Sequence, residues 1–87
     1  MKQTVFAIRQ NSRYGYRYCY YNGYDGEKHR WTKNLRNAYF FFDAISAFKL
    51  RDRLKYNNPT VLTVIKNGNN KIVMTLIQTR RSLGVGE

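Results

Sequence analysis

Residues 60–79, TVLTVIKNGNNKIVMTLIQT, contain two apolar runs on either side of a short polar segment. The runs at 60–66 and 71–79 are rich in β-branched residues, which favour pleated strands. Between them, Asn67, Gly68, Asn69 and Asn70 tolerate the positive φ angles of tight turns. The pattern predicts a β-hairpin in the C-terminal part of the chain.

A helix is predicted just before this hairpin. Asp43 is suited to cap the run AISAFKLRDRLK at 44–55, which is rich in helix formers, and the sequence Asn-Asn-Pro at 57–59 ends it. On such a helix Ala47, Leu50 and Leu54 share one side, while Lys49 and Arg53 lie on the opposite, outward side. The alternation of basic and other residues at 49–56 also fits a strand, but the alanines and the cap favour the helix. Upstream, Leu35, Ala38 and Phe41 or Phe42 also recur at helical spacing.

The N-terminal third has the alternation of strands. Strands are predicted at 4–10 and 14–21, with a polar turn at 10–13, a glycine-containing turn at 22–27 and a short third strand at 28–32. The predicted fold is therefore α+β: an antiparallel sheet of four to five strands with one main helix packed on one face, in the order β-β-(β)-α-β-β. Residues 1–81 are expected to form a single domain and residues 82–87 a flexible tail.

Charge is the strongest global feature of the sequence. Sixteen Lys and Arg against five Asp and Glu give a formal net charge of +11 in 87 residues. Such a field attracts polyanions, and its self-repulsion destabilises the compact state unless a partner neutralises it. No apolar run approaches the roughly 20 residues of a membrane span, so no membrane partner is expected. Cys19 is the only cysteine and cannot form an internal disulfide or, with the single His29, a zinc site. We expect a cytoplasmic protein without a metal or another cofactor.

Six of the eight tyrosines lie in SRYGYRYCYYNGYDG, residues 12–26. On a strand, Tyr14, Tyr16, Tyr18 and Tyr20 share one face, and Arg13, Arg17, Cys19 and Tyr21 share the other. Buried cysteines are common, which favours an exposed tyrosine row, whereas amphipathic tyrosines can also line a core. A mixed arrangement is expected, in which the middle of the strand packs and the ends near Tyr14, Tyr16 and Tyr24 face solvent.

Exposed rings beside cations suit single-stranded RNA, because unstacked bases stack on aromatic faces and cations neutralise phosphates. The sequence contains no RNP-type motif, GXXG loop or zinc-finger spacing, so broad, shape-tolerant binding of single-stranded or structured RNA is expected rather than sequence-specific binding. Stacking is predicted for three rings, Tyr14, Tyr16 and Tyr18. Phosphate contacts are predicted for Arg9, Arg13, Arg17, Lys28, Arg30, Lys33, Arg36, Lys49 and Arg53.

A non-enzymatic role is expected, because the candidates for catalysis have simpler interpretations. His29 stands among basic residues, Asp25 and Glu27 are too few carboxylates for a metal nuclease, and Cys19 lacks a local base. Two alternatives stay open. One is a protein inhibitor that docks on an acidic or nucleic-acid-binding surface of its partner without RNA. The other is a basic endoribonuclease toxin of the RelE type, although those usually open with helices and this chain opens with strands.

The run Tyr21-Asn-Gly-Tyr, followed by Trp31, Thr32, Ala38 and Phe41, resembles sequences of small basic early proteins of tailed phages. Within that group the resemblance is to RNA-binding inhibitors of the toxin ribonucleases of type III toxin–antitoxin systems. It implies RNA and a host toxin ribonuclease as partners, and a role in blocking antiviral defence in the bacterial cytoplasm. It covers the middle third of the chain and carries no site motif.

Overall fold

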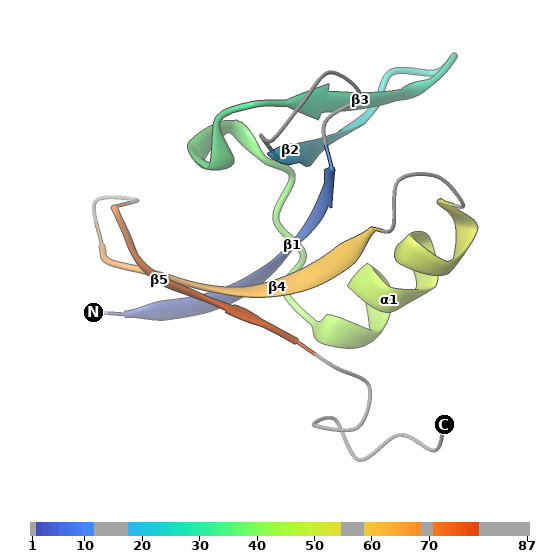
Figure 1. The fold of residues 1–87 in the computed structure, drawn as a ribbon. Helices are drawn as coiled ribbons and strands as arrows, with labels where there is room; N and C mark the ends of the chain where they lie inside the picture. The colour runs from blue at the N-terminus through green and yellow to red at the C-terminus, as the bar shows by residue number, and fades with distance from the viewer. Residues whose placement is uncertain (1, 12–17, 55–58, 69–70, 79–87) are drawn as a thin grey trace.

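The computed structural model describes residues 2–11, 18–54, 59–68 and 71–78 and shows an α+β fold (Figure 1). Within these residues, five antiparallel strands form one sheet in the order β3-β2-β1-β4-β5, and one α-helix packs on it. The elements along the chain are β1 (Gln3–Asn11), β2 (Tyr18–Tyr24), β3 (His29–Thr32), the 3-10 helix η1 (Leu35–Asn37), α1 (Ala44–Arg53), β4 (Thr60–Lys66) and β5 (Ile72–Ile77).

The central strand β1 has very different contacts with its two neighbours. It pairs with β4 along its length, from Gln3 opposite Lys66 to Arg9 opposite Thr60. Its pairing with β2 is confined to its C-terminal end, where Arg9 lies opposite Tyr20. β1 and β2 therefore diverge, and the edge of β1 near Phe6 is open to another segment of the chain.

Residues 38–41 occupy the space between the two diverging strands. Phe6 and Phe41 exchange two backbone hydrogen bonds, at 2.8 and 2.7 Å, and the Tyr39 amide donates to the Tyr21 carbonyl at 2.7 Å. The helical spacing noted at Leu35, Ala38 and Phe41 is therefore misleading: only the single turn η1 forms, and an extended segment follows. The unpaired backbone groups of β1 and β2 determine this conformation, because buried amides and carbonyls must find partners.

Side chains cover both faces of the sheet. On the face that we name the η1 face, Val5, Ala7, Leu62 and Val64 pack with Ala38. On the opposite α1 face, the helix residues Ala44, Ala47 and Phe48 cover Val61 beside Phe6 and Phe41. Figure 1 shows α1 lying against the end of the sheet where β4 begins. Side chains of the extended segment 38–41 point to both faces of the sheet. Ala38 and Phe40 pack in the cluster on the η1 face, and Phe41 packs in the cluster on the α1 face.

The helix begins where the sequence predicts. The carboxylate of Asp43 accepts hydrogen bonds from the Ser46 amide at 2.7 Å and the Ser46 hydroxyl at 2.9 Å. These bonds favour the charged carboxylate and lower the pKa of Asp43 below its ordinary value. α1 then buries Ala44, Ala47 and Phe48 and leaves Lys49 and Arg53 exposed, as its periodicity predicts.

Ile8 offers a test of how tightly the α1 face packs. It is fully buried and lies opposite Val61 in the β1–β4 ladder. We expect Ile8→Val to lower the free energy of unfolding by about 1 kcal/mol, because it removes one buried methylene and leaves a small cavity. Urea unfolding measures the change. Ile45→Val makes the same change on an exposed side chain of α1 and should have little effect; equal losses from both variants would contradict a tightly packed face.

Candidate nucleic-acid interface

The tyrosine-rich strand β2 contributes to both faces of the sheet. Tyr18 and Tyr20 lie on the η1 face, where Tyr20 packs against the core, and Tyr21 is buried on the α1 face. The two ends differ from this middle, because Tyr18 is 43% exposed and Tyr24 is 60% exposed. The packed middle and the exposed Tyr24 agree with the expected mixed arrangement, and the other end of the predicted strand lies outside the described residues. The strand continues to Tyr24, so the turn predicted at 22–27 starts too early. The predicted site residues Arg13, Tyr14, Tyr16 and Arg17 lie outside the described residues.

Two cation–aromatic pairs lie on the η1 face. The guanidinium of Arg9 lies 3.9 Å from the centre of the Tyr18 ring, and the ammonium of Lys66 lies 4.3 Å from the centre of the Phe40 ring. Arg9 and Tyr18 come together because they are diagonal neighbours in the β1–β2 ladder. Arg9 and Tyr18, two of the predicted site residues, therefore contact each other in a cation–π arrangement.

A second group of aromatic rings encloses a pocket on the α1 face. The cavity has a volume of about 380 Å³, and its lining residues are Tyr21, Gly23, Tyr24, Tyr39, Phe41 and Leu50. Tyr21 lies against Phe41 with a ring separation of 6.4 Å and only 20° between the planes. Tyr24 and Tyr39, in contrast, are 60% and 51% exposed. The pocket thus has a buried aromatic floor and two tyrosines that solvent reaches.

A bulge in β2 builds this pocket. The β2–β3 register shifts between Tyr21, opposite Trp31, and Gly23, opposite Arg30. Asn22 is the extra residue, and its side-chain amide donates to the Asn37 carbonyl at 2.8 Å. Tyr21 and Tyr24 would face opposite sides of a regular strand, whereas the bulge places both on the α1 face.

Gly23 permits the bulge. Its φ angle is +119°, a conformation that residues with a side chain rarely adopt. A Cβ atom built on Gly23 would lie 3.7 Å from Cδ2 of Tyr39, an ordinary contact distance, so the backbone angle and not lack of space requires glycine here. Because the Tyr39 amide also donates to the Tyr21 carbonyl, the backbone fixes the position of this ring beside β2.

Tyr21 stays neutral at the floor of the pocket. Its hydroxyl lies 2.9 Å from Nδ1 of His29, and burial, followed by repulsion from Tyr39 and Tyr24, raises the pKa of Tyr21. His29 also contacts the Tyr24 ring at a centroid distance of 5.1 Å. The pocket therefore offers flat, uncharged ring surfaces rather than an ionised phenol.

The β2–β3 loop is held by Asp25. Its carboxylate accepts hydrogen bonds from the amides of Lys28 and Glu27 and from the side chain of Arg30. These bonds lower the pKa of Asp25 to about 2. Because the carboxylate is charged at any physiological pH, the loop that carries Tyr24 and His29 has a stable anchor.

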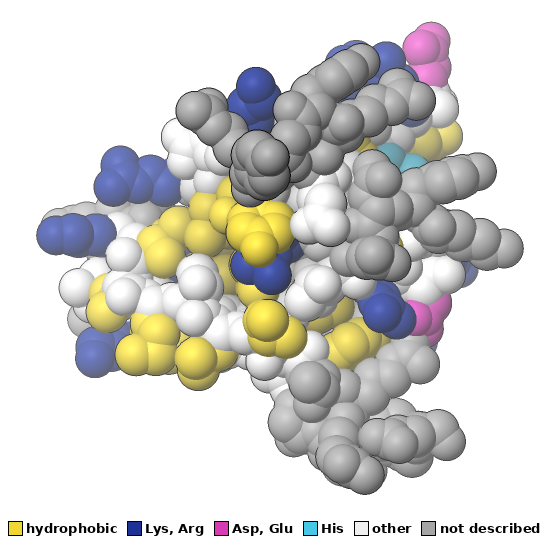
Figure 2. All heavy atoms as spheres, viewed as in Figure 1, with side chains coloured by type: hydrophobic (Ala, Val, Ile, Leu, Met, Phe, Trp, Pro, Cys, Tyr) yellow, Lys and Arg dark blue, Asp and Glu magenta, His cyan; other side chains and the backbone are white. Residues whose placement is uncertain are grey.

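The predicted phosphate-binding residues do not form one stripe. Lys49 and Arg53 are exposed on α1, whereas Arg9 and Arg30 lie on the η1 face. Lys28, Lys33 and Arg36 are exposed around the β2–β3 hairpin and η1. Figure 2 shows Lys and Arg side chains spread over the visible face, with hydrophobic groups between them. α1 contributes Leu50 to the lining of the aromatic pocket, and Lys49 and Arg53 are exposed at other positions of the helix.

Carboxylates neutralise little of this charge. Two ion pairs connect described residues, Arg30 with Asp25 and Arg51 with Asp52. Most of the Lys and Arg side chains in the described part of the chain thus form no ion pair with a described carboxylate. The surface field remains available to a polyanion.

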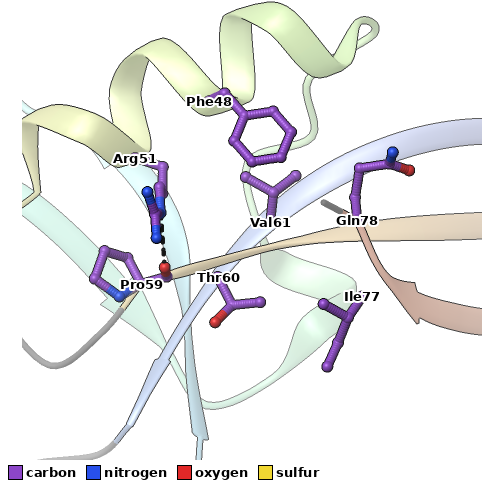
Figure 3. Close-up of a pocket in the computed structure, with 7 residues that line it drawn as sticks. All are labelled: Phe48, Arg51, Pro59, Thr60, Val61, Ile77 and Gln78. Atoms are coloured by element: carbon purple, nitrogen blue, oxygen red, sulfur yellow. Dashed lines mark hydrogen bonds between the residues drawn. The ribbon is translucent and has the colours of Figure 1, made fainter. Parts of the chain in front are cut away.

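A separate hollow of about 320 Å³ lies where α1 meets the start of β4 and the end of β5 (Figure 3). Its lining includes Phe48 and Val61, and Figure 3 shows Ile77 directed to the other side of β4. The guanidinium of Arg51 donates to the Pro59 carbonyl at 3.0 Å and to Asp52. Because these bonds already engage Arg51, this hollow is a weak candidate for an anion site.

Sequence reasoning missed Tyr39, Phe41 and Leu50 as pocket residues. A hydrophobic run that enters a helix, such as residues 39–42, usually packs inside, and Leu50 shares the core-facing side of the predicted helix with Ala47 and Leu54. The consecutive aromatic residues Tyr39, Phe40 and Phe41, of a type that favours extended strands, are the signal that the sequence offers.

Neither helix within the described ranges has the length and apolar character that a bilayer crossing requires. The described residues also contain no group of three or more His, Cys, Asp and Glu side chains placed to hold a metal ion. Comparison of the chain with protein-family models, with curated proteins and with solved structures found no match.

Proposed function

We propose that the protein binds single-stranded RNA without catalysing its cleavage. An unstacked base enters the aromatic pocket, and the flanking phosphates lie against Lys and Arg side chains. The observation that supports this most directly is the pair of half-exposed tyrosines, Tyr24 and Tyr39, over a neutral aromatic floor in a chain of net charge +11. Base stacking on such rings and phosphate neutralisation are the two main contributions to single-strand binding.

The cations on α1 and in the β2–β3 loop complete this site. Arg53 lies on the same helix as the pocket residue Leu50, and Lys28 precedes His29, whose ring contacts Tyr24. On the η1 face, the Arg9–Tyr18 pair offers a second place where a base can stack against a guanidinium or a ring. A strand that wraps around the β2–β3 end of the sheet would meet both places.

The resemblance to phage inhibitors of toxin ribonucleases gives this activity a biological setting. In it, the protein would act in the cytoplasm of a bacterial host and bind RNA together with an RNA-handling enzyme. The alternative is direct inhibition of a partner protein without RNA. The exposure of Phe42 and Ile45 at the start of α1 favours that alternative, because exposed apolar groups often mark protein contacts.

Titration of labelled single-stranded and double-stranded RNA of equal length tests the proposal. We expect the single strand to bind roughly tenfold more tightly, because one stacked base contributes about 1–3 kcal/mol and a duplex keeps its bases paired. Fluorescence anisotropy at moderate salt measures both affinities. Equal affinities for single-stranded and double-stranded RNA would mean that the protein attracts polyanions in general and does not stack bases. The absence of RNA binding at low salt would favour the alternative function, direct inhibition of a partner protein.

A further inference from the structure

The edge strand β5 differs from the rest of this basic molecule. Residues Ile72–Ile77 carry no charge, although the chain as a whole has a net charge of +11. Val73, Met74, Leu76 and Ile77 are each about half exposed. Sheet edges in soluble proteins are usually protected by charged residues or prolines, because an open apolar edge pairs readily with another strand.

The outward backbone groups of β5 can be identified from its pairing with β4. The Gln78 amide donates to the Val61 carbonyl at 2.8 Å, and the next residue, Ile77, lies opposite Leu62. Hydrogen-bonded and non-hydrogen-bonded pairs alternate along an antiparallel ladder. The amide and carbonyl groups of Ile77 and Thr75 are therefore directed away from β4, toward the open edge.

We propose that two copies of the protein pair through β5 in an antiparallel arrangement centred on Thr75. Thr75 of one copy then lies opposite Thr75 of the other and exchanges both backbone hydrogen bonds with it. Met74 of each copy then lies opposite Leu76 of the other, so these exposed apolar side chains gain apolar partners, as a twofold interface requires. The β4–β5 register shifts between Met74 and Ile72, so Val73 is an extra residue and regular pairing covers the part of β5 that follows it. The two sheets become one continuous sheet of ten strands.

The absence of charged residues in β5 favours an identical strand over an acidic partner at this edge. A partner attracted by the field of this protein would be acidic, and β5 itself offers no cation for its carboxylates. Pairing of identical uncharged strands instead requires no charge complementarity at the contact. Association is opposed by the repulsion between two protein molecules that each have a net charge of +11. This repulsion acts over the Debye length and weakens as salt screens it.

This repulsion gives the dimer a distinctive salt dependence. One pair of short strands is a small interface compared with the roughly 800 Å² per partner of stable complexes, so we expect reversible self-association. Added salt should strengthen it, whereas RNA binding should weaken in salt. Measurements on RNA-free protein therefore test the dimer independently of the proposed RNA binding.

Sedimentation velocity over a range of protein concentrations, at low and high salt, tests the pairing. The wild-type protein should shift from monomer toward dimer as concentration and salt rise. Thr75→Lys should shift the dimer dissociation constant upward by at least tenfold, because it places two like charges opposite each other at the twofold axis. Thr4→Lys adds the same charge on an exposed position of β1 and is the matched control.

Thr75→Pro provides a second, independent variant. It removes an amide that is directed away from β4, so the β4–β5 ladder keeps its hydrogen bonds while the outer edge loses a donor. It should remain folded by circular dichroism and sediment as a monomer. A wild-type protein that stays monomeric at high concentration and high salt would overturn the proposal, as would dimers that tolerate Thr75→Lys and Thr75→Pro as well as they tolerate Thr4→Lys.

Discussion

Raising the salt concentration from 50 to 200 mM is expected to weaken RNA binding by about a hundredfold. The logarithm of the association constant falls with the logarithm of salt at about 0.7 per phosphate contact for single strands, so a loss of this size corresponds to about five contacts. The exposed cations on α1 and around the β2–β3 hairpin can supply that number: Lys28, Lys33, Arg36, Lys49 and Arg53. Anisotropy titrations at four or five salt concentrations give the slope.

A pair of matched variants tests whether these contacts are local. Lys49→Gln removes a cation from α1, whereas Lys71→Gln removes one at the distant β4–β5 hairpin; both residues are exposed. Loss of a phosphate contact should make the salt slope shallower by about 0.7 for Lys49→Gln and leave it nearly unchanged for Lys71→Gln. Equal slopes for the two variants would mean that RNA senses the overall field and is not positioned on α1. A flat salt dependence of the wild-type protein would contradict phosphate binding altogether.

The parts of the fold that follow from local patterns are predictable from the sequence. The two apolar runs at 60–66 and 71–79, which are rich in β-branched residues, correspond to β4 and β5. Asp43 caps α1, as the side-chain oxygen of an aspartate at this position predicts. In each case the sequence pattern that predicts the element spans only a few neighbouring residues. Strand patterns and helix caps depend on such local sequence, so they can be recognised without knowledge of the tertiary structure.

The parts that depend on distant partners are not predictable in this way. The pair Asn22-Gly23 suggests a turn, but β3 continues to pair with β2 beyond it, and the extra residue becomes a bulge. The residues around Phe41 have helical spacing, but the open edge of Phe6 draws them into an extended segment. Tertiary hydrogen bonding overrides local preference at both positions.

The candidate site shows the same division. The sequence indicates that Arg9 and Tyr18 belong to one surface, and the strand register brings them into contact. The aromatic pocket, however, requires that Tyr21, Tyr24 and Tyr39 meet on one face, and the bulge at Asn22 makes this possible. A shift of one residue in a strand reverses the direction of every side chain beyond it, so the pocket depends on a detail of register that sequence patterns do not specify.

Replacing both exposed tyrosines of the pocket should cause a large loss of RNA affinity. We expect the double variant Tyr24→Leu, Tyr39→Leu to bind single-stranded RNA about thirtyfold more weakly. Leucine keeps an apolar side chain but removes the flat face on which a base stacks, and a stacked base contributes about 2 kcal/mol. Because both rings are at least half exposed, the fold should persist, which circular dichroism and thermal unfolding can verify.

Two further variants separate stacking from other effects of the same substitutions. Phe42→Leu also replaces an exposed aromatic ring, 78% accessible, but Phe42 does not line the pocket, so affinity should stay near the wild-type value. Tyr24→Phe keeps the ring and removes only the hydroxyl, so it too should bind normally if stacking is the main interaction. Wild-type affinity in the folded double variant would contradict base binding in this pocket. An equal loss in Phe42→Leu would instead indicate that RNA contacts exposed apolar groups wherever they occur on the surface.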